Sequence, residues 1–299
     1  MLNNNVSIII INYNGDKFVE KLVVSLNQQT YPYSEVVIVD NHSSDKSYLY
    51  LLKNLKNVTL FRLLENRGFS FAVNLGVKQS KFENLILLNN DVYLEKNFIK
   101  NCIENMNQNR DYHFFAPLVL DYNGEFVDSA GDDVGNFIRP YKILHGKKIS
   151  ETKIIKKDVE GFSMSICYFA KDYFVRAGML DERFFMYFED VDFSLRLKKY
   201  GYKILFTPDT VGYHFISGTT KLENRMDEYS PKKVFWEGRN RVFLYFKNYK
   251  ILSLKNWLSF VSGTLISILF HINKTKKFSF YVKGLIFGFL SLKGIKRYE

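Results

Sequence analysis

Four short, mainly apolar stretches, three of which end in polar residues, constrain the fold of this 299-residue chain more than any other feature. They occupy residues 6–12, 35–40, 58–63 and 85–91. Short strands that are apolar throughout are typical of a parallel sheet that is buried on both faces. Residues with helical spacing of apolar side chains separate the stretches, for example between 16 and 29. This alternation predicts an α/β fold with a mostly parallel sheet flanked by helices.

Polar side chains gather where these stretches end. The residues concerned are Asn12, Asn14, Asp40, Asn89 and Asp91. In open α/β sheets ligands bind outside the carboxyl ends of the strands, so we expect these side chains to converge on one crevice. Any one of them alone would be an ordinary turn residue. Their recurrence at three strand ends favours a binding site.

A second group of acids, Glu189, Asp190 and Asp192, lies between an aromatic run and Arg196. The apolar spacing that follows predicts a helix beginning at these acids. Its N-terminus carries positive partial charge, which favours the ionised forms of Glu189 and Asp190. Asp192 lies one helical turn from Arg196 and is expected to pair with it. Acids at helix starts are also common as plain caps, so both a structural and a catalytic role are open at this point.

Residues 121–160 interrupt the regular pattern with glycine and proline. We expect loops and short hairpins that pass over the sheet, where a partner is often admitted. Regular stretches return at 161–169, 203–207 and 210–215, which we expect as three further strands. Asp132 and Asp133 resemble a metal-binding pair, but they lie among glycines and are interpreted as turn acids.

Several protein classes are disfavoured by what the chain lacks. No Gly-x-Gly-x-x-Gly follows the first stretch and no Gly-x-x-x-x-Gly-Lys-Ser/Thr occurs, which argues against dinucleotide enzymes and P-loop NTPases. A nucleotidyltransferase would need a Gly- and Lys/Arg-rich loop after Asn12, which is not present. Cys102 and Cys167 form no Cys-x-x-Cys pair and fit a reducing cytosol. With no signal peptide visible at the N-terminus, a cytoplasmic protein is expected.

The net charge of +11 is confined to the last quarter of the chain. Residues 1–220 carry 26 Lys and Arg against 26 Asp and Glu, whereas residues 221–299 carry 16 against 5. A basic region indicates nucleic acid or an anionic membrane surface as a partner. Because no nucleic-acid-binding module accompanies the charge, nucleic acid is not expected.

Two runs in this basic region, 256–273 and 284–292, carry no charged residue. The first contains several Ser, Thr and Asn residues and is short for a membrane-spanning helix, which needs about 20 mainly apolar residues. Apolar faces edged by lysine favour helices that lie on the inner face of the cell membrane, so peripheral attachment is predicted. A dimerisation surface and a packed helical subdomain are the alternatives. We therefore expect an α/β domain over residues 1–220 and a helical, basic, membrane-associated region over 221–299.

Five motifs follow one another along residues 6–220. They are the opening strand with Asn12-Tyr-Asn14-Gly, then Val-Ile-Val-Asp40-Asn41-His-Ser-Ser-Asp45, Asn66-Arg67-Gly68-Phe69, Leu-Leu-Asn89-Asn90-Asp91, and Phe188-Glu189-Asp190-Val-Asp192, with His214 downstream. In this order they resemble glycosyltransferase family 2, whose catalytic domain has the GT-A fold. The Asn-Asn-Asp motif and the Gly-Met-Leu-Asp-Glu-Arg-Phe-Phe approach to the acids are similar to a rhamnosyltransferase-like branch, which builds bacterial surface polysaccharides on lipid carriers.

The resemblance implies roles for individual residues. The nucleotide-diphosphate sugar would be bound by Asn12, Asn14, Asp40, Asn41, Arg67, Gly68 and Asn90. Mg²⁺ or Mn²⁺ would be held by Asp91, with Asn89 and His214 as helpers. Asp190 would be the catalytic base, with the adjacent Glu189 as its rival.

The chemistry agrees with these roles. A departing nucleoside diphosphate develops negative charge, which a divalent cation neutralises through oxygen ligands. A carboxylate opposite the leaving group can take the proton of the attacking hydroxyl, and a single attack from that face inverts the anomeric centre. Asn89 stands where the family usually has an acid, which weakens the expected metal site. His214 has a structural alternative, because an aromatic-rich strand end can hold a histidine without metal.

The resemblance thus predicts an inverting, metal-dependent glycosyltransferase. Its expected donor is dTDP-rhamnose or a UDP-sugar, and its expected acceptor is a glycan or a lipid-linked oligosaccharide. The alternative is a catalytically degenerate protein that binds nucleotide sugars or serves as a membrane scaffold.

Overall fold

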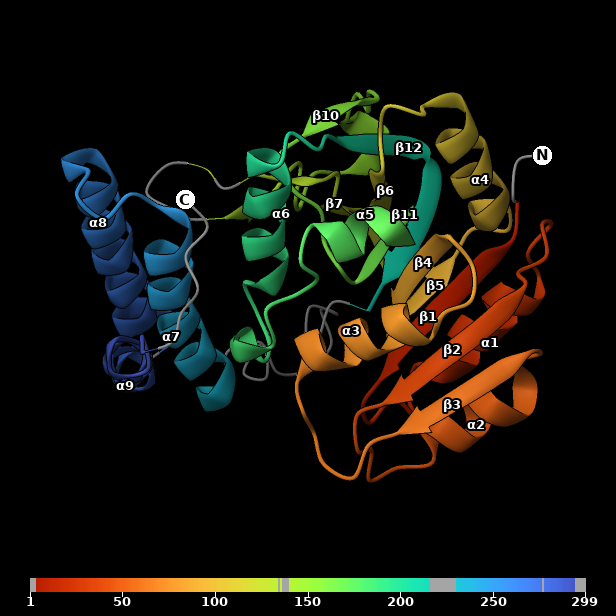
Figure 1. The fold of residues 1–299 in the computed structure, drawn as a ribbon, viewed down its shortest axis with the longest axis horizontal. Coiled ribbons are helices and arrows are strands. Elements are labelled where there is room, and N and C mark those ends of the chain that lie inside the picture. Colours follow the sequence, from red (N-terminus) through yellow and green to blue (C-terminus); the bar gives the residue numbers. More distant parts are fainter. Residues whose placement is uncertain (1–3, 134, 136–139, 216–229, 276, 294–299) are drawn as a thin grey trace.

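A ten-stranded sheet runs through the middle of the fold (Figure 1). The computed structural model describes residues 4–133, 135, 140–215, 230–275 and 277–293. The strand order is β10-β12-β6-β11-β4-β1-β2-β3, with β5 paired to β12 and β7 paired to β6. The strands of this sheet are β1 (Val6–Asn12), β2 (Glu35–Asp40), β3 (Val58–Arg62), β4 (Asn84–Asn89), β5 (Val92–Leu94), β6 (Phe114–Asp121), β7 (Val127–Ser129), β10 (Lys157–Val159), β11 (Ile166–Ala170) and β12 (Ile204–His214).

The predicted α/β sheet is confirmed. Strands β3, β2, β1 and β4 are parallel neighbours, and so are β6 and β12. Between these two parallel blocks runs β11, antiparallel to both β4 and β6. A separate two-stranded hairpin joins β8 (Asp132–Asp133) to β9 (Tyr141–Lys142).

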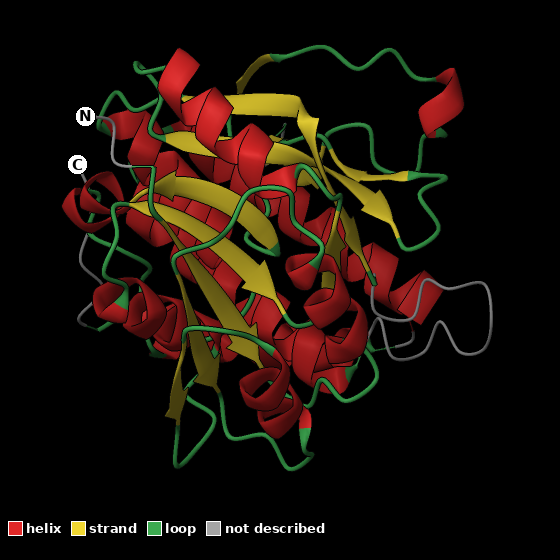
Figure 2. Cartoon of the chain, turned by 90° about the vertical axis from the view of Figure 1, so that its right-hand side faces the viewer, coloured by secondary structure: helices red, strands yellow, loops and turns green. Residues whose placement is uncertain are grey.

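Helices cover both faces of the sheet, as Figure 2 shows. Every residue of β1 is buried, and its side chains alternate: Ile9 and Ile11 belong to one core cluster, Ile8 and Ile10 to the other. This explains why the strand is apolar throughout, since a strand with helices on both faces has no solvent side. The first face is covered by α3 (Phe69–Gln79), α5 (Lys171–Arg176) and α6 (Glu189–Lys199), and the second by α1 (Val19–Asn27), α2 (Ser47–Asn54) and α4 (Phe98–Gln108).

Two details of the sheet differ from the sequence expectation. The stretches 203–207 and 210–215, expected as separate strands, form the single strand β12, because a register shift between Thr207 and Val211 lets it continue past Pro208. The strand-like run at 161–169 becomes regular only from Ile166 onward.

The C-terminal region is helical, as predicted, and its first helix lies beside α6 (Figure 1). It consists of α7 (Pro231–Asn248), α8 (Leu254–Phe270), the π-helical turn η5 (His271–Thr275) and α9 (Phe278–Leu290). Gly238 of α7 and Gly284 of α9 bring the two backbones together, since a side chain at either position would meet the other helix. None of the helices in the described ranges is both long and apolar enough to cross a membrane. The expected domain boundary at residue 220 falls within 216–229, outside the described residues.

Candidate active site

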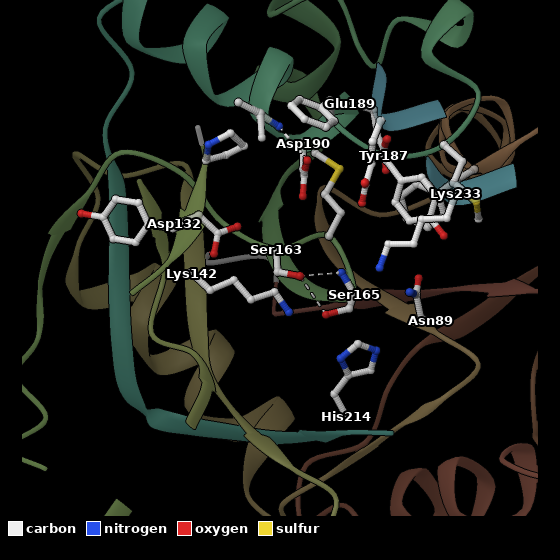
Figure 3. Close-up of a pocket in the computed structure, with 18 residues that line it drawn as sticks. Asn89, Asp132, Lys142, Ser163, Ser165, Tyr187, Glu189, Asp190, His214 and Lys233 are labelled. Atoms are coloured by element: carbon white, nitrogen blue, oxygen red, sulfur yellow. Dashed lines mark hydrogen bonds between the residues drawn. The ribbon is translucent and has the colours of Figure 1, made fainter. Parts of the chain in front are cut away.

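A cavity of about 540 Å³ opens between the strand ends, the first turn of α6 and the first turns of α7. Four of the predicted site residues line it, namely Asn89, Glu189, Asp190 and His214. The acids of α6 lie on one side, and Asn89 and His214 lie across from them (Figure 3). The fold therefore brings the predicted base and two of the predicted metal ligands to one cavity, although they are far apart in the sequence.

Glu189 and Asp190 form the first turn of α6, where the sequence predicted a helix start. Burial raises the pKa of Asp190, while the N–H of Val191 and the charge of Lys142 act in the opposite direction. Burial and the neighbouring charge of Asp190 raise the pKa of Glu189 well above its usual range. Its Oε2 accepts no hydrogen bond from the described residues. Carboxyl groups with raised pKa values in a cavity are typical of acid–base sites.

The backbone that leads into these acids has an uncommon conformation. Phe185, Tyr187 and Phe188 have φ angles of 63°, 70° and 69°, in the left-handed region that bulky residues rarely adopt. Each such residue costs on the order of 1–3 kcal/mol and persists only where the surroundings enforce it. The strain lies directly before Glu189 and Asp190, which places it where strained backbone is most often functional.

His214, at the end of β12, lies between two acids. Its Nδ1 is 3.0 Å from Oδ2 of Asp128, and its Nε2 is 3.5 Å from Oδ1 of Asp91. Burial on its own would lower the pKa of His214, but the hydrogen bond to Asp128 and the negative charges of Asp91 and Asp128 raise it to about 9. Asp128 is completely buried. A carboxylate on one ring nitrogen fixes the imidazole so that the other nitrogen is presented, an arrangement common behind metal-binding histidines.

Asn89 and Asp91, on the same side of the site as His214, each have a side-chain oxygen that lacks a hydrogen-bond donor among the described residues. The Oδ1 atom of each is buried and accepts no hydrogen bond within the described part of the chain. Buried acceptors usually have a partner, and oxygen atoms of this kind are the ligands that Mg²⁺ and Mn²⁺ prefer. The described residues hold no group of three or more His, Cys, Asp or Glu side chains arranged for a metal. The donor set therefore fits a cation only if Asn89 joins Asp91 and His214.

Four of the predicted nucleotide-binding residues lie at the ends of β1, β2 and β4. Asn12 donates from Nδ2 to Oδ1 of Asp40 at 2.8 Å, and its Oδ1 accepts from Nδ2 of Asn90 at 2.9 Å. Asn12 and Asp40 are completely buried, so these contacts tie the strand ends together. Asn14 extends the network, because its Oδ1 accepts from the N–H of Ser44 at 2.8 Å.

The other three predicted nucleotide-binding residues connect β2 to α3. Oδ1 of Asn41 accepts from the N–H of Arg67 at 2.9 Å, and its Nδ2 donates to the carbonyl of Gly68 at 3.1 Å. The seven predicted nucleotide-binding residues are not among those that line the cavity. They lie next to it in the chain and in space, since Asn90 follows the lining residue Asn89 and Gly68 precedes the lining residue Phe69. Their contact with a nucleotide stays a prediction.

Four charged residues of the cavity, Asp132, Lys142, Lys233 and Glu237, were not predicted. Asp132, which the sequence indicates as a turn acid, lies on β8 and points into the cavity (Figure 3). Burial and the charge of Asp190 raise the pKa of Asp132 to about 7. Lys142 on β9 lies 2.8 Å from Oδ2 of the buried Asp128, and Lys233 comes from α7. The Asp-Asp pair is visible in the sequence, but only the pairing of β8 with β9 brings Asp132 to the site.

Asp192 has the structural role that was expected of it. It accepts from Nε of Arg196 at 3.0 Å, and both side chains are buried. Lys247 and Asn248 of α7 also reach Asp192, at 2.8 Å and 2.7 Å. These partners belong to α6 itself and to α7, so Asp192 holds α6 against α7.

Residues 7–174, more than half of the chain, match the family model described as Glycosyl transferase family 2. The chain belongs to this family and is a glycosyltransferase, which confirms the resemblance carried by its motifs.

Curated relatives include named rhamnosyltransferases. The dTDP-rhamnosyl transferase RfbF of Shigella flexneri is 25% identical and is matched over 100% of both chains. The N-acetylglucosaminyl-diphospho-decaprenol L-rhamnosyltransferase of Mycobacterium tuberculosis is 24% identical over 71% of this chain and 76% of that protein. The low-salt glycan biosynthesis hexosyltransferase Agl10 of Haloferax volcanii is 25% identical over 66% of this chain, which spans only 62% of that protein.

Solved structures share the fold. The mannosyltransferase PcManGT of Pyrobaculum calidifontis, in complex with GDP-Man and Mn²⁺, has a TM-score of 0.58 at 13% identity, covering 97% of this chain and 88% of its own. GalNAc-T7 with UDP, GalNAc and Mn²⁺ also has a TM-score of 0.58, at 15% identity, covering 97% of this chain and 59% of its own. At these identities the likeness concerns the fold alone, and the predicted GT-A fold is confirmed.

Proposed function

We propose that this glycosyltransferase is inverting and metal-dependent, and that Asp190 is its catalytic base. One observation carries the proposal: Asp190 faces Asn89 and His214 across a single cavity (Figure 3). A sugar held between them would have its leaving group on the strand side and its open face toward α6. The carboxylate of Asp190 would then take the proton of the acceptor hydroxyl while that oxygen bonds to the anomeric carbon. The bond from that carbon to the phosphate oxygen breaks, and the nucleoside diphosphate leaves with the electron pair.

The strand side would hold the divalent cation. Its ligands would be Asp91, Asn89 and Nε2 of His214, with Asp128 orienting the imidazole. When bound, Mg²⁺ or Mn²⁺ would neutralise the charge that develops on the diphosphate. The solved structures with Mn²⁺ support divalent metal use, as does the pair of buried oxygens without donors.

The nucleotide would lie along the ends of β1 and β2 and the start of α3. In that position Asn14, Asn41, Arg67, Gly68 and Asn90 would surround it. Asn12 and Asp40, which are completely buried and hydrogen-bonded to each other, would contribute by fixing the shape of this surface. We propose dTDP-rhamnose as the donor ahead of UDP-sugars, because two of the relatives are named rhamnosyltransferases. A glycan or lipid-linked oligosaccharide is the proposed acceptor, in line with the name of the mycobacterial relative.

The C-terminal helices would attach the enzyme peripherally to the inner face of the cell membrane. Large apolar side chains on α8 and α9 are exposed, among them Leu258, Leu265, Leu269 and Leu290. No Asp or Glu occurs from residue 238 to residue 298, so the charged side chains around this face are basic. Apolar side chains edged only by positive charge match an anionic lipid surface better than a second copy of the same basic face.

The catalytic proposal is tested with Asp190→Asn and Asp91→Ala, using turnover of dTDP-rhamnose and thermal shifts with dTDP. Asp190→Asn removes the base, so we expect turnover to fall about 10²–10⁴-fold while dTDP still raises the melting temperature. Asp91→Ala should remove the part of that shift which depends on Mn²⁺. Asp172→Asn, a surface acid paired with Arg176, serves as the control and should leave both unchanged. Wild-type turnover in both test variants would refute the assigned roles, and no turnover of any donor by the wild type would favour a degenerate binding protein.

A further inference from the structure

The loop Phe184–Tyr187 leads directly into the acids of α6, and donors from α3 and α7 reach its carbonyl groups. One of them is bound by α3: the carbonyl of Phe185 accepts from the N–H of Phe69 at 2.6 Å. A buried carbonyl needs a donor. The donors for the remaining three carbonyls of the loop come from the C-terminal helix α7, and the N–H of Met186 is a further donor to the carbonyl of Phe184 at 2.6 Å.

Asn240 of α7 supplies most of them. It is completely buried, and its Nδ2 lies 3.0 Å from the carbonyl oxygen of Phe184, 2.8 Å from that of Met186 and 2.7 Å from that of Tyr187. Three carbonyl oxygens around one atom fix that atom as the nitrogen of the amide. The two N–H groups of one side chain are therefore shared among three carbonyls of the loop before Glu189.

Arg239 holds the amide of Asn240 in place. Its Nε donates to Oδ1 of Asn240 at 2.7 Å, which excludes the flipped amide. Its Nη2 donates to the carbonyls of Arg183 and Phe184, both at 2.6 Å. The pair thus forms a rigid set of donors aimed at the loop, and this set compensates for the left-handed backbone of Phe185, Tyr187 and Phe188.

We propose that Asn240, supported by Arg239, is a positioning residue that sets the place of Asp190 in the cavity. The inference rests on the proposed role of Asp190 as the base. It makes α7, which lies outside the matched family region 7–174, a working part of the catalytic site. The placement of Lys233 and Glu237 of the same helix in the cavity wall agrees with this.

A purely structural role for α7 is carried by other residues. Near its end, Lys247 contacts Asp181 at 2.7 Å and Asp192 at 2.8 Å, and these ion pairs attach the helix to the segment before the loop and to the body of α6. On a different face, Arg241 donates from Nε to Oγ1 of Thr264 in α8 at 2.9 Å. Thr264→Val removes a side-chain hydrogen bond of α7 without touching the loop, so it is the matched control.

The test uses the full chain carrying Asn240→Leu, which keeps the size of the side chain and removes its donors. We expect hydrogen–deuterium exchange to rise in peptides covering residues 184–192 and turnover number on dTDP-rhamnose to fall about 10²-fold, since a misplacement of about 1 Å can have that effect. The KM for dTDP-rhamnose should change less than threefold. Thr264→Val should lower the melting temperature without either effect. Arg239→Lys, a milder change, should shift exchange and turnover number in the same direction by about tenfold or less.

Exchange and turnover separate this inference from the proposed function. If the wild type turns over no donor, the proposed function fails, and the positioning role is still decided by exchange in residues 184–192. The inference is overturned if folded Asn240→Leu and Arg239→Lys proteins exchange and turn over like the wild type. It is equally overturned if Thr264→Val loosens the loop and lowers the turnover number as much as Asn240→Leu does.

Discussion

Asp190 can accept a proton only when it is ionised, yet burial raises its pKa. Among the charged residues of the cavity wall, those that interact with it are Glu189 on its own helix, Asp132 on β8 and Lys142 on β9. Of these, only Lys142 favours the ionised form. The acid limb of the rate profile should therefore lie above the range of an ordinary carboxylate, and Lys142 should keep it from lying higher still.

Replacing Lys142 with methionine tests this balance. The base is active above its pKa and inactive below it, and the pKa of Asp190 rises when the positive charge is removed. We therefore expect the acid limb of kcat/KM for dTDP-rhamnose to move to higher pH in Lys142→Met, measured between pH 4.5 and 8. Lys148→Met removes a lysine that pairs with Glu151 on the surface and should leave the limb in place. A limb that stays or moves to lower pH in Lys142→Met would contradict the prediction.

Asp132 should make stability fall as pH rises. Burial and the charge of Asp190 raise its folded-state pKa to about 7 from the ordinary 3.8. Between these two values the folded state binds more protons than the unfolded state, so the free energy of unfolding decreases with rising pH. Asp132→Asn removes this penalty, and we expect its melting temperature to exceed that of the wild type at pH 8 and to approach it near pH 4.

The neighbouring Asp133 provides a control of opposite sign. The hydrogen bond from the N–H of Gly135 lowers its pKa, as does that from Tyr141. Its ionised form therefore stabilises the fold, and this contribution is present above about pH 4 and lost as pH falls below it. Asp133→Asn should lower the melting temperature at pH 8. If Asp132→Asn and Asp133→Asn changed the melting temperature equally at pH 8, the opposite pKa shifts assigned to the two carboxyl groups would be contradicted.

The start of α3 and the loop before α6 meet at a glycine. A Cβ atom on Gly68, whose φ is +85°, would lie 2.5 Å from the carbonyl oxygen of Phe185. That contact cannot be relieved by rotating a side chain, so Gly68→Ala should push the loop away from α3 and displace Asp190. We expect a loss of stability of about 1–3 kcal/mol beyond the strain of the φ angle itself, together with a lower turnover number.

Gly201 provides the comparison for Gly68. Its φ is +75°, but no atom lies within 4 Å of an added Cβ. Gly201→Ala therefore reports the strain of the left-handed conformation alone, about 1 kcal/mol. Chemical denaturation of both variants separates the two effects. Equal losses of stability, with turnover unchanged in Gly68→Ala, would mean that the loop adapts without moving the acid.

How much of the fold could be predicted depends on whether an element carries its own pattern. β1 and β2 are apolar throughout and were predicted with the observed boundaries. The acids of α6 were placed correctly at its first turn, because helix starts have local signals. β12 was divided in two because Pro208 and Asp209 break the apolar pattern, and a bulge is a property of the pairing with β6.

The parts of the site that could not be predicted are made by long-range pairing. Asp128 lies beside His214 because β7 pairs with β6 and β6 pairs with β12. No spacing in the sequence connects these two residues. The same holds for Asn240, whose donors meet a loop more than fifty residues earlier in the chain. The spacing of apolar residues indicates where a single strand or helix begins and ends. It does not indicate which residues of other elements will contact those ends.

At the scale of the whole molecule, the excess positive charge lies in the last quarter of the chain, together with many of the exposed large apolar side chains. The α/β part has balanced charge, whereas α8 and α9 combine exposed leucines and phenylalanines with lysine as their only charged residue type. α7 links the two parts, since one end of it reaches the cavity and the same helix packs against α9. An enzyme attached through α8 and α9 would hold its cavity close to the lipid surface, where a lipid-linked acceptor would be presented.

The membrane prediction is tested by changing two exposed leucines on one face of α8. Leu265 and Leu269 are 55% and 57% exposed and lie one helical turn apart. Their replacement by serine removes apolar surface that would enter the lipid, and a loss of about 1.4 kcal/mol or more lowers binding at least tenfold. Binding is measured by flotation with vesicles of phosphatidylserine and phosphatidylcholine. Leu49→Ser/Leu52→Ser, a comparably exposed pair on α2, should leave flotation unchanged. A wild-type protein that does not float would refute the membrane prediction, and a dimer that Leu265→Ser/Leu269→Ser dissociates would assign this face to a second copy of the chain.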